Sequence, residues 1–209
     1  MAQRRRTTPG PRGERGELAA RILDCARSSF AEHGWAGTTI RAVARTADVD
    51  PALVYHYFRS KADLLEAATT PPPGFLDSVV EAWHGPTAEL GDRLVRNLLA
   101  AWANDGYRVV LRSILMTAAH DASTRERLTQ SVELSLMGPA TIDLDDAERL
   151  VRAGLVASQL LGFAMLRYVW TVEPLASMSE RDAINHLAPT IQRYIDGTER
   201  QGPTKEGAR

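Results

Sequence analysis

Apolar side chains recur at helical spacing along most of the chain. From Glu17 onward, apolar residues stand four positions apart and so share one face of an amphipathic helix: Leu18, Ile22, Ala26 and Phe30. Gly34 is expected to end this helix, because glycine adopts the left-handed conformation of a helix C-terminus at little cost. No segment alternates apolar and polar residues as a half-buried strand does, so the expected fold class is all-α.

Two short helices are expected after the first one. The hydroxyl of Thr39 can accept a hydrogen bond from the free amides of a helix that begins directly after it. A turn near Asp48 ends that helix. Pro51 suits the first position of the next, where its missing N–H is not needed, and this third helix runs to about Phe58. One longer helix followed by two short ones across a tight turn is the outline of a helix-turn-helix unit.

The rest of the chain is expected to be helical as well. Ser60 and Asp63 form a capping-box-like start for a fourth helix, and the prolines at 71–73 end it because proline cannot donate a helical hydrogen bond. At this break, either the N-terminal unit moves about a hinge near Thr69 and Thr70, or the helix simply ends and a rigid, extended connection follows. Further helices are predicted at about 75–83, 87–103, 107–119, 123–136, 145–170 and 179–195.

The charges are divided unevenly along the chain. Residues 1–61 carry 11 Lys and Arg against 6 Asp and Glu, whereas residues 62–209 carry 14 against 20. A basic head on an acidic body favours a polyanion as the partner of the head alone. Residues 1–14 are rich in proline and glycine and are expected to form a disordered basic arm. This arm either enters a DNA minor groove or is merely solvated, and its cations are Arg4, Arg5, Arg6 and Arg12.

Composition and motifs argue against both a membrane protein and an enzyme. The single cysteine, Cys25, cannot form an internal disulfide, and no signal peptide opens the chain, so a cytoplasmic location is expected. The uncharged apolar stretch 153–166 is too short to span a bilayer. The sequence contains no H-E-x-x-H, no paired cysteines, no G-x-S-x-G and no glycine-rich phosphate loop, and its five histidines are scattered. No catalytic residue, metal ligand or cofactor is therefore expected.

Several short runs in the head carry a more specific signal. They are FAEHGW at 30–35, TTIRAVA at 38–44, ADV at 47–49, VYHYF at 54–58 and SKADLL at 60–65. In order and spacing these runs resemble the signature of the TetR (tetracycline-repressor-like) family. The resemblance implies a helix-turn-helix DNA-binding domain at 15–60 and a helical ligand-binding and dimerisation domain at 61–196, followed by a flexible tail at 197–209. It also implies a transcriptional regulator, most simply a repressor, that binds double-stranded DNA as a homodimer and is released by a small-molecule effector.

The residue types and the resemblance together give a set of expected DNA contacts: Thr39, Arg41, Pro51, Ala52, Leu53, Tyr55, His56, Tyr57 and Lys61. Arg41 has the planar fork that reads guanine in the major groove, unless it is merely solvated. Small residues at the start of the third helix allow close approach. The hydroxyls of Tyr55 and Tyr57 suit phosphate oxygens, although Tyr55 could instead pack in the core. Lys61 begins the fourth helix, whose free amides favour an anion.

The predicted helix 145–170 carries a stripe of small residues. Gly154, Ser158 and Gly162 stand at four-residue intervals, and a glycine inside a helix costs about 1 kcal/mol relative to alanine, which indicates a packing reason. In the TetR family the last two long helices pair with those of a second copy, and the resemblance gives this role to 145–170 and 179–195. The alternative is that the glycines pack only within one chain. The expected interface consists of Gly154, Leu155, Ser158, Leu161, Gly162 and Met165.

Aromatic and polar residues of the body give a candidate ligand pocket. Trp102, Met116 and Phe163 are the preferred lining, and Gln159 or Arg167 would orient a polar group of the ligand. Each of these residues could instead belong to an ordinary helical core. The alternative function is a DNA-binding regulator or architectural protein that a partner protein controls, without a small-molecule inducer.

Overall fold

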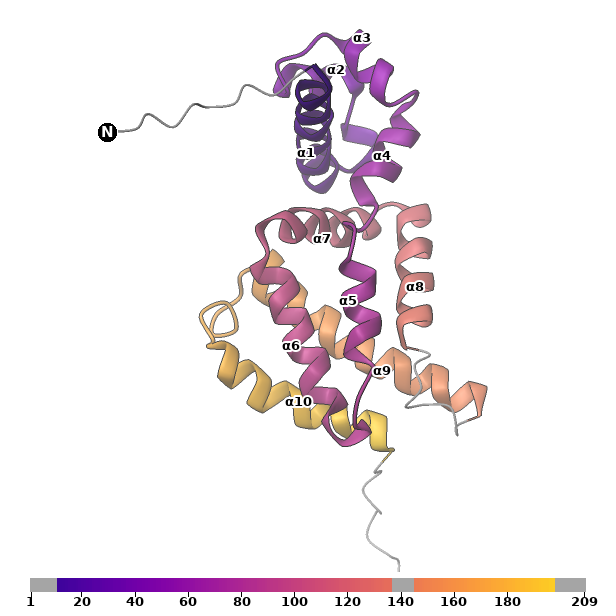
Figure 1. Cartoon of the computed structure of the whole chain (residues 1–209), viewed down its shortest axis with the longest axis vertical. Helices are drawn as coiled ribbons and strands as arrows, with labels where there is room; N and C mark the ends of the chain where they lie inside the picture. The colour runs from indigo at the N-terminus through magenta and orange to yellow at the C-terminus, as the bar shows by residue number, and fades with distance from the viewer. Residues whose placement is uncertain (1–10, 137–144, 198–209) are drawn as a thin grey trace, which may run out of the picture. The chain divides into compact units, whose positions relative to one another are not determined.

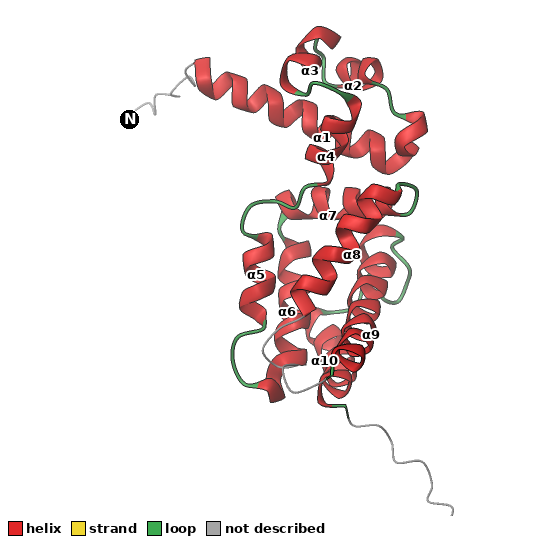
Figure 2. Cartoon of the chain, turned by 90° about the vertical axis from the view of Figure 1, so that its right-hand side faces the viewer, coloured by secondary structure: helices red, strands yellow, loops and turns green. Residues whose placement is uncertain are grey.

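The computed structural model describes residues 11–136 and 145–197 of the chain, and throughout these two ranges the secondary structure is helical (Figures 1 and 2). The expected all-α fold class is thereby confirmed. Most of the expected basic arm, residues 1–10, and most of the expected tail, residues 198–209, lie outside the described residues, as do residues 137–144.

The described residues form two compact units. The first contains the residues up to Pro71 together with Val109–Glu126, and the second contains Pro72–Arg108 together with the residues from Arg127 onward. The chain therefore passes from one unit to the other three times. The expected boundary at residue 60 would place the fourth helix in the body, whereas in the structure this helix packs on the first one and belongs to the first unit.

The first unit is built around its longest helix, α1 (Pro11–Gly37). This helix begins at Pro11, earlier than the expected Glu17. Gly34 interrupts it with φ 64° and ψ −170°, and one further turn follows. The end expected at Gly34 is thus present as a kink. Glycine occupies it because φ in this range is strained for residues that carry a Cβ.

Three short helices follow α1 (Figures 1 and 2): α2 (Ile40–Thr46), α3 (Pro51–Tyr57) and α4 (Lys61–Thr69). Helices α2 and α4 pack against α1, and α3 packs against α2. Their buried faces share one apolar cluster with α1, and its largest fully buried side chains are Ile22, Phe30, Val43, Val54 and Leu64. Parts of α7 (Asp105–Ala118) and α8 (Ala122–Leu136) complete the unit. The hydroxyl of Ser113 on α7 donates to the backbone oxygen of Arg27 on α1 at 3.3 Å.

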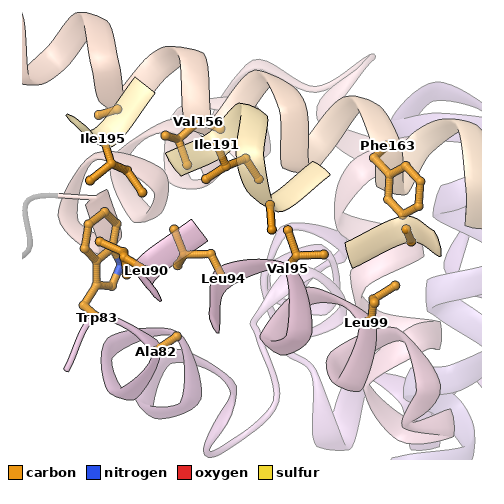
Figure 3. Close-up of a cluster of buried hydrophobic side chains, with 14 residues drawn as sticks. Ala82, Trp83, Leu90, Leu94, Val95, Leu99, Val156, Phe163, Ile191 and Ile195 are labelled. Atoms are coloured by element: carbon orange, nitrogen blue, oxygen red, sulfur yellow. The ribbon is translucent and has the colours of Figure 1, made fainter. Parts of the chain in front are cut away.

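The second unit contains α5 (Phe75–Ala82), the 3₁₀ turn η1 (Thr87–Glu89), α6 (Leu90–Ala103), α9 (Asp146–Ala164), the π-helical segment η3 (Met165–Val169) and α10 (Glu180–Asp196). Its core lies where α6, α9 and α10 meet, with the end of α5 beside it (Figure 3). The buried side chains there include Trp83, Leu90, Leu94, Val95, Val156, Phe163, Ile191 and Ile195.

The expected helix starts are confirmed by their caps. The side chains of Ser60, Asp145 and Ser179 accept hydrogen bonds from the backbone amides of the third residue that follows each of them. The prolines end α4 as expected, since Thr69 is its last residue and α5 begins at Phe75. Within the second unit, the hydroxyl of Tyr107 donates to the backbone oxygen of Pro73 at 3.1 Å and fixes the end of the proline segment that precedes α5.

Among the described helices, one has the dimensions of a membrane span. The segment Ala147–Val169 is long and apolar enough to cross a bilayer, and 28% of its most apolar 18-residue stretch is buried inside the protein. The sequence expectation rested only on the uncharged stretch 153–166, which is shorter than this helical segment. One face of the helix nevertheless belongs to the core, through Ala153, Val156 and Phe163. Helices in the core of a protein can have the same length and apolar composition as a membrane span.

A close approach of α6 and α10 fixes the second unit. A Cβ at Gly91 would lie 2.5 Å from the backbone oxygen of Ala188, closer than two such atoms can come. The amide of Gly91, one of the free donors of the first turn of α6, donates to Oε1 of Gln192 at 2.8 Å, and Nε2 of Gln192 donates to the backbone oxygen of Thr87 at 2.9 Å. Only a glycine lets the two backbones meet here.

Replacing Gly91 by alanine is expected to destabilise the protein. Because the obstructing atom is a backbone oxygen, α10 must move away from α6, and overpacking of this kind costs about 1–3 kcal/mol. Urea unfolding followed by circular dichroism would measure the change. Gly16→Ala is the matched control: that helical position is open, so the variant should gain up to about 1 kcal/mol from helix propensity. A Gly91→Ala protein as stable as the wild type would contradict this account of the docking.

Candidate nucleic-acid interface

Side-chain caps start both short helices of the head. Oγ1 of Thr39 accepts from the amide of Ala42 at 3.1 Å, which confirms the cap expected for α2. Oδ1 of Asp50 accepts from the amide of Ala52 at 2.7 Å, and Pro51 occupies the first turn of α3. The role of Asp50 was not predicted, although an acid directly before a helix-starting proline is the signal that would have revealed it.

The turn between α2 and α3 is held by the backbone. Asp48 adopts φ 53°, a left-handed conformation that aspartate tolerates better than most residues. The amide of Val49 donates to the oxygen of Ala44 at 3.0 Å, and that of Ala47 donates to the oxygen of Val43 at 2.9 Å. The angle between the two helices is therefore set by a turn with little freedom.

The two faces of α3 differ sharply. Val54 is fully buried in the cluster shared with α1, and Tyr57 and Phe58 are half-buried against it. Tyr55 is 53% exposed, so the alternative that places Tyr55 in the core is wrong. His56 is also exposed, and its ring meets the ring of Tyr57 edge-on with centroids 5.3 Å apart. The polar groups of α3 therefore point outward from the unit.

The start of α3 and the outer side of α2 add to this surface. Ala52 is exposed, and Pro51 and Leu53 are half-buried. Thr39 and Arg41 are exposed, and within the described residues the guanidinium of Arg41 forms no hydrogen bond or ion pair. Arg45 is exposed one turn after Arg41, on the same side of α2, and was not predicted. The i, i+4 spacing of the two arginines is the signal that could have added it.

Lys61 lies at the start of α4 but is not free. Its ammonium donates to the backbone oxygen of Trp35 and lies 4.3 Å from the centroid of the Trp35 ring. Burial lowers the pKa of Lys61 from the ordinary value. The sequence predicted a DNA contact at this position, and the structure shows that the ammonium already has a partner in the last turn of α1.

Two family models match the chain over most of its described length. The model for "Bacterial regulatory proteins, tetR family" matches residues 22–68, and the model for "Tetracyclin repressor-like, C-terminal domain" matches residues 88–195. The second match alone covers more than half of the 209 residues. The chain belongs to the TetR family.

Individual relatives agree with this assignment. A TetR-family regulator from Streptomyces coelicolor A3 is 31% identical and superposes with a TM-score of 0.61 over 93% of this chain and 99% of that one. The HTH-type transcriptional regulator BetI of Burkholderia thailandensis is 28% identical over 49% of this chain and 62% of its own length. The HTH-type transcriptional repressor KstR2 of Rhodococcus jostii is 38% identical over 34% of this chain and 32% of its own. These matches span less than two thirds of either curated relative.

Family membership settles the class of protein. TetR-family members are DNA-binding transcription factors, so this chain is a transcription regulator and not an enzyme. The helix with the dimensions of a membrane span lies inside the match to the C-terminal regulatory domain and is a core helix of that domain.

Three residues of the expected ligand site come together in the second unit of the TetR-family regulator. Trp102 is buried and stacks on Tyr168 with ring centroids 4.7 Å apart and an interplanar angle of 3°. The guanidinium carbon of Arg167 lies 5.3 Å from the Tyr168 ring centroid and 5.7 Å from that of Phe163. Burial raises the pKa of the Tyr168 hydroxyl, and the positive charge of Arg167 partly offsets that rise. Gln159 is half-buried, and Met116 belongs to the other compact unit.

Residues of the expected dimer interface divide into two groups. A Cβ added at Gly154 or Gly162 would meet no atom of this chain's described residues within 4 Å. Leu155 and Ser158 are exposed beside Gly154. Leu161 and Met165 are half-buried, and Leu161 packs against the core of its own chain. The open side of α9 thus centres on the glycines.

Proposed function

We propose that this TetR-family regulator represses transcription by binding a pseudo-palindromic operator as a homodimer, and that a small molecule releases it. The observation that carries the proposal is the outward face of α2 and α3, where Arg41, Arg45, Tyr55 and His56 are exposed while Val54 anchors α3 in the core. A protein of this kind acts at the chromosome, in the cytoplasm.

The exposed groups suit the two kinds of DNA contact. The unpaired fork of Arg41 has the geometry to read O6 and N7 of guanine, and the Tyr55 hydroxyl suits a phosphate oxygen. Ala52 and Leu53 near the start of α3 allow the helix to approach base edges closely. The remaining expected contacts are Thr39 and Pro51 beside the helix starts, together with His56, Tyr57 and Lys61.

Purified protein should select genomic fragments that share a pseudo-palindrome, with half-sites about one helical turn, or a multiple of it, apart.

On such a fragment, Arg41→Ala is expected to weaken the free energy of DNA binding by about 1–3 kcal/mol and to relax the preference at one base pair. Tyr55→Phe should cost about 1 kcal/mol on specific and random duplexes alike, because a phosphate contact carries no sequence information. Fluorescence anisotropy measures both. Arg96→Ala, which removes an exposed charge from α6, is the control and should bind like the wild type. Equal binding by all variants would remove this face from the proposal.

Support for the homodimer comes from the open side of α9. Val151 is 62% exposed, and Leu150 and Leu155 are exposed on the same helix, so the described residues leave apolar surface uncovered next to two glycines. Apolar surface of this kind next to small residues favours close packing of a second helix. In the family, dimers form through the last long helices, and α9 is one of them.

Gly154→Ala separates a helix-packing role from a solvent-exposed one. In a monomer the change should raise stability by up to about 1 kcal/mol, because the position is helical and open. In a dimer with closely packed helices the added methyl group should weaken association by about 1–3 kcal/mol. Sedimentation over a range of concentrations distinguishes the two, with Gly16→Ala as the control. A wild-type protein that is monomeric at micromolar concentration would contradict the dimer.

Support for a ligand comes from the aromatic cluster around Arg167. Nη1 of Arg167 donates to the backbone oxygen of Leu175 at 2.6 Å, while its buried Nε has no hydrogen-bond acceptor among the described residues. A buried donor without a partner is costly, and an acidic group on an apolar ligand would satisfy it. The effector we propose is therefore an aromatic or otherwise apolar acid held between Trp102, Phe163 and Arg167.

A panel of aromatic carboxylic acids and their methyl esters tests this. At least one acid should raise the melting temperature of the wild type and lower its DNA affinity, because a ligand that releases DNA must bind the other conformation better. Its ester should act more weakly, and Arg167→Gln should lose the response while Arg181→Gln keeps it. If no compound shifts the melting temperature but a partner protein removes the regulator from DNA, control by a partner protein replaces control by a ligand.

A further inference from the structure

The ammonium of Lys61 is held in one place by Trp35. A lysine side chain normally samples many rotamers, and ordering it costs up to about 2 kcal/mol. Here the ammonium donates to the Trp35 backbone oxygen and lies over the face of the Trp35 ring at 4.3 Å. Of its three N–H groups, one is used by the oxygen and the ring covers one side, so a third remains for an acceptor.

Trp35 is itself anchored to the core of the head. Its ring stacks on that of Phe30 with centroids 6.3 Å apart and planes 8° from parallel, and Phe30 is fully buried. The kink at Gly34, with φ 64°, turns the chain so that Trp35 follows directly after the main part of α1. Trp35 is still 39% exposed, so one edge of the arrangement faces solvent.

We propose that Trp35 is a positioning residue that holds the Lys61 ammonium ready for a DNA phosphate, a proposal that rests on the DNA-binding function above. Lys61 lies four residues after Tyr57, the last residue of α3, in the first turn of α4. The free amides of that turn also favour an anion. Because Trp35 fixes the ammonium before DNA arrives, binding costs less side-chain entropy than it would with a freely moving lysine.

The partial burial of Lys61 supports this role. Burial lowers the pKa of Lys61, whose ammonium lies beside the indole ring of Trp35. A cation that is already partly desolvated loses less hydration when a phosphate approaches. The competing explanation is that Lys61 and Trp35 simply tie the end of α1 to the start of α4, with no part in DNA binding.

A double-mutant cycle on DNA binding distinguishes the two explanations. Trp35→Leu removes the ring but keeps the backbone oxygen, and Lys61→Met removes the charge but keeps an unbranched side chain of similar length. The probe is a random-sequence duplex, whose phosphates suffice for the contact, titrated by fluorescence anisotropy at several salt concentrations. Lys61→Met should lower the slope of log Kd against log salt by about 1. Trp35→Leu should weaken binding about two- to fivefold, the size of an exposed cation–π interaction.

The coupling between the two changes decides the outcome. If Trp35 acts through Lys61, adding Trp35→Leu to Lys61→Met should change the Kd by less than about 1.5-fold. Equal effects of Trp35→Leu in both backgrounds would overturn the positioning role and leave the proposed DNA-binding function intact. A wild-type protein with no salt-dependent binding to any duplex would instead overturn the DNA-binding function itself.

A second measurement covers the case in which Trp35→Leu fails to fold. Trp35→Phe keeps a ring to stack on Phe30 and should give a smaller loss of affinity than leucine. The sequence has only two lysines, Lys61 and Lys205, so the ε-methylene signals of the folded protein are simple to assign by NMR. In Trp35→Phe the Lys61 signal should move toward that of a free lysine and respond less to added duplex. If the ε-methylene signal of Lys61 in the wild type does not shift when duplex DNA is added, the phosphate contact is contradicted.

Discussion

The burial of Val54 in the apolar cluster of α1, α2 and α4 is the interaction on which the DNA-facing surface depends. Helices of seven residues, such as α2 and α3, are too short to persist alone in water. They exist here because one side of each is buried in the apolar cluster shared with α1 and because Thr39 and Asp50 each accept from a free amide at their starts. With Val54 fixed inward, Tyr55 and His56 must point outward. The same packing that stabilises the head therefore orients the residues that face DNA.

Sequence alone predicted most of the head and the order of the body helices, because these follow from local signals. Caps such as Ser60, Asp145 and Ser179 and the proline break after Thr70 are encoded within a few residues. What sequence could not predict involves partners distant in the chain. The contact of Lys61 with Trp35 joins residues 26 positions apart, and that of Gly91 with Gln192 joins residues 101 apart. No periodic pattern encodes such pairs.

The glycines show the same contrast between local signals and partners that are distant in the chain. A glycine in a helix signals a packing reason, and the sequence pointed to Gly154 and Gly162 on that ground. A Cβ at either position would meet no described atom of the chain within 4 Å, while a Cβ at Gly91, which the sequence did not single out, would meet a backbone oxygen. The pattern of small residues thus indicates that close packing occurs somewhere but not with which partner. For Gly91 the partner is α10 of the same chain, whereas no described residue of the chain is the partner of the α9 glycines.

The chain passes between the two units at three places. One is the proline segment after α4, and the other two lie inside continuous helices, within α7 near Val109 and within α8 near Arg127. A helix transmits a rotation or shift along its length, whereas an extended connection transmits little besides tension. Inside the first unit, Ser113 of α7 donates to the backbone of Arg27, whose side chain in turn donates to the oxygen of Ala68 near the end of α4 at 3.4 Å. Within the first unit, a displacement of α7 therefore bears on α1 and α4 together.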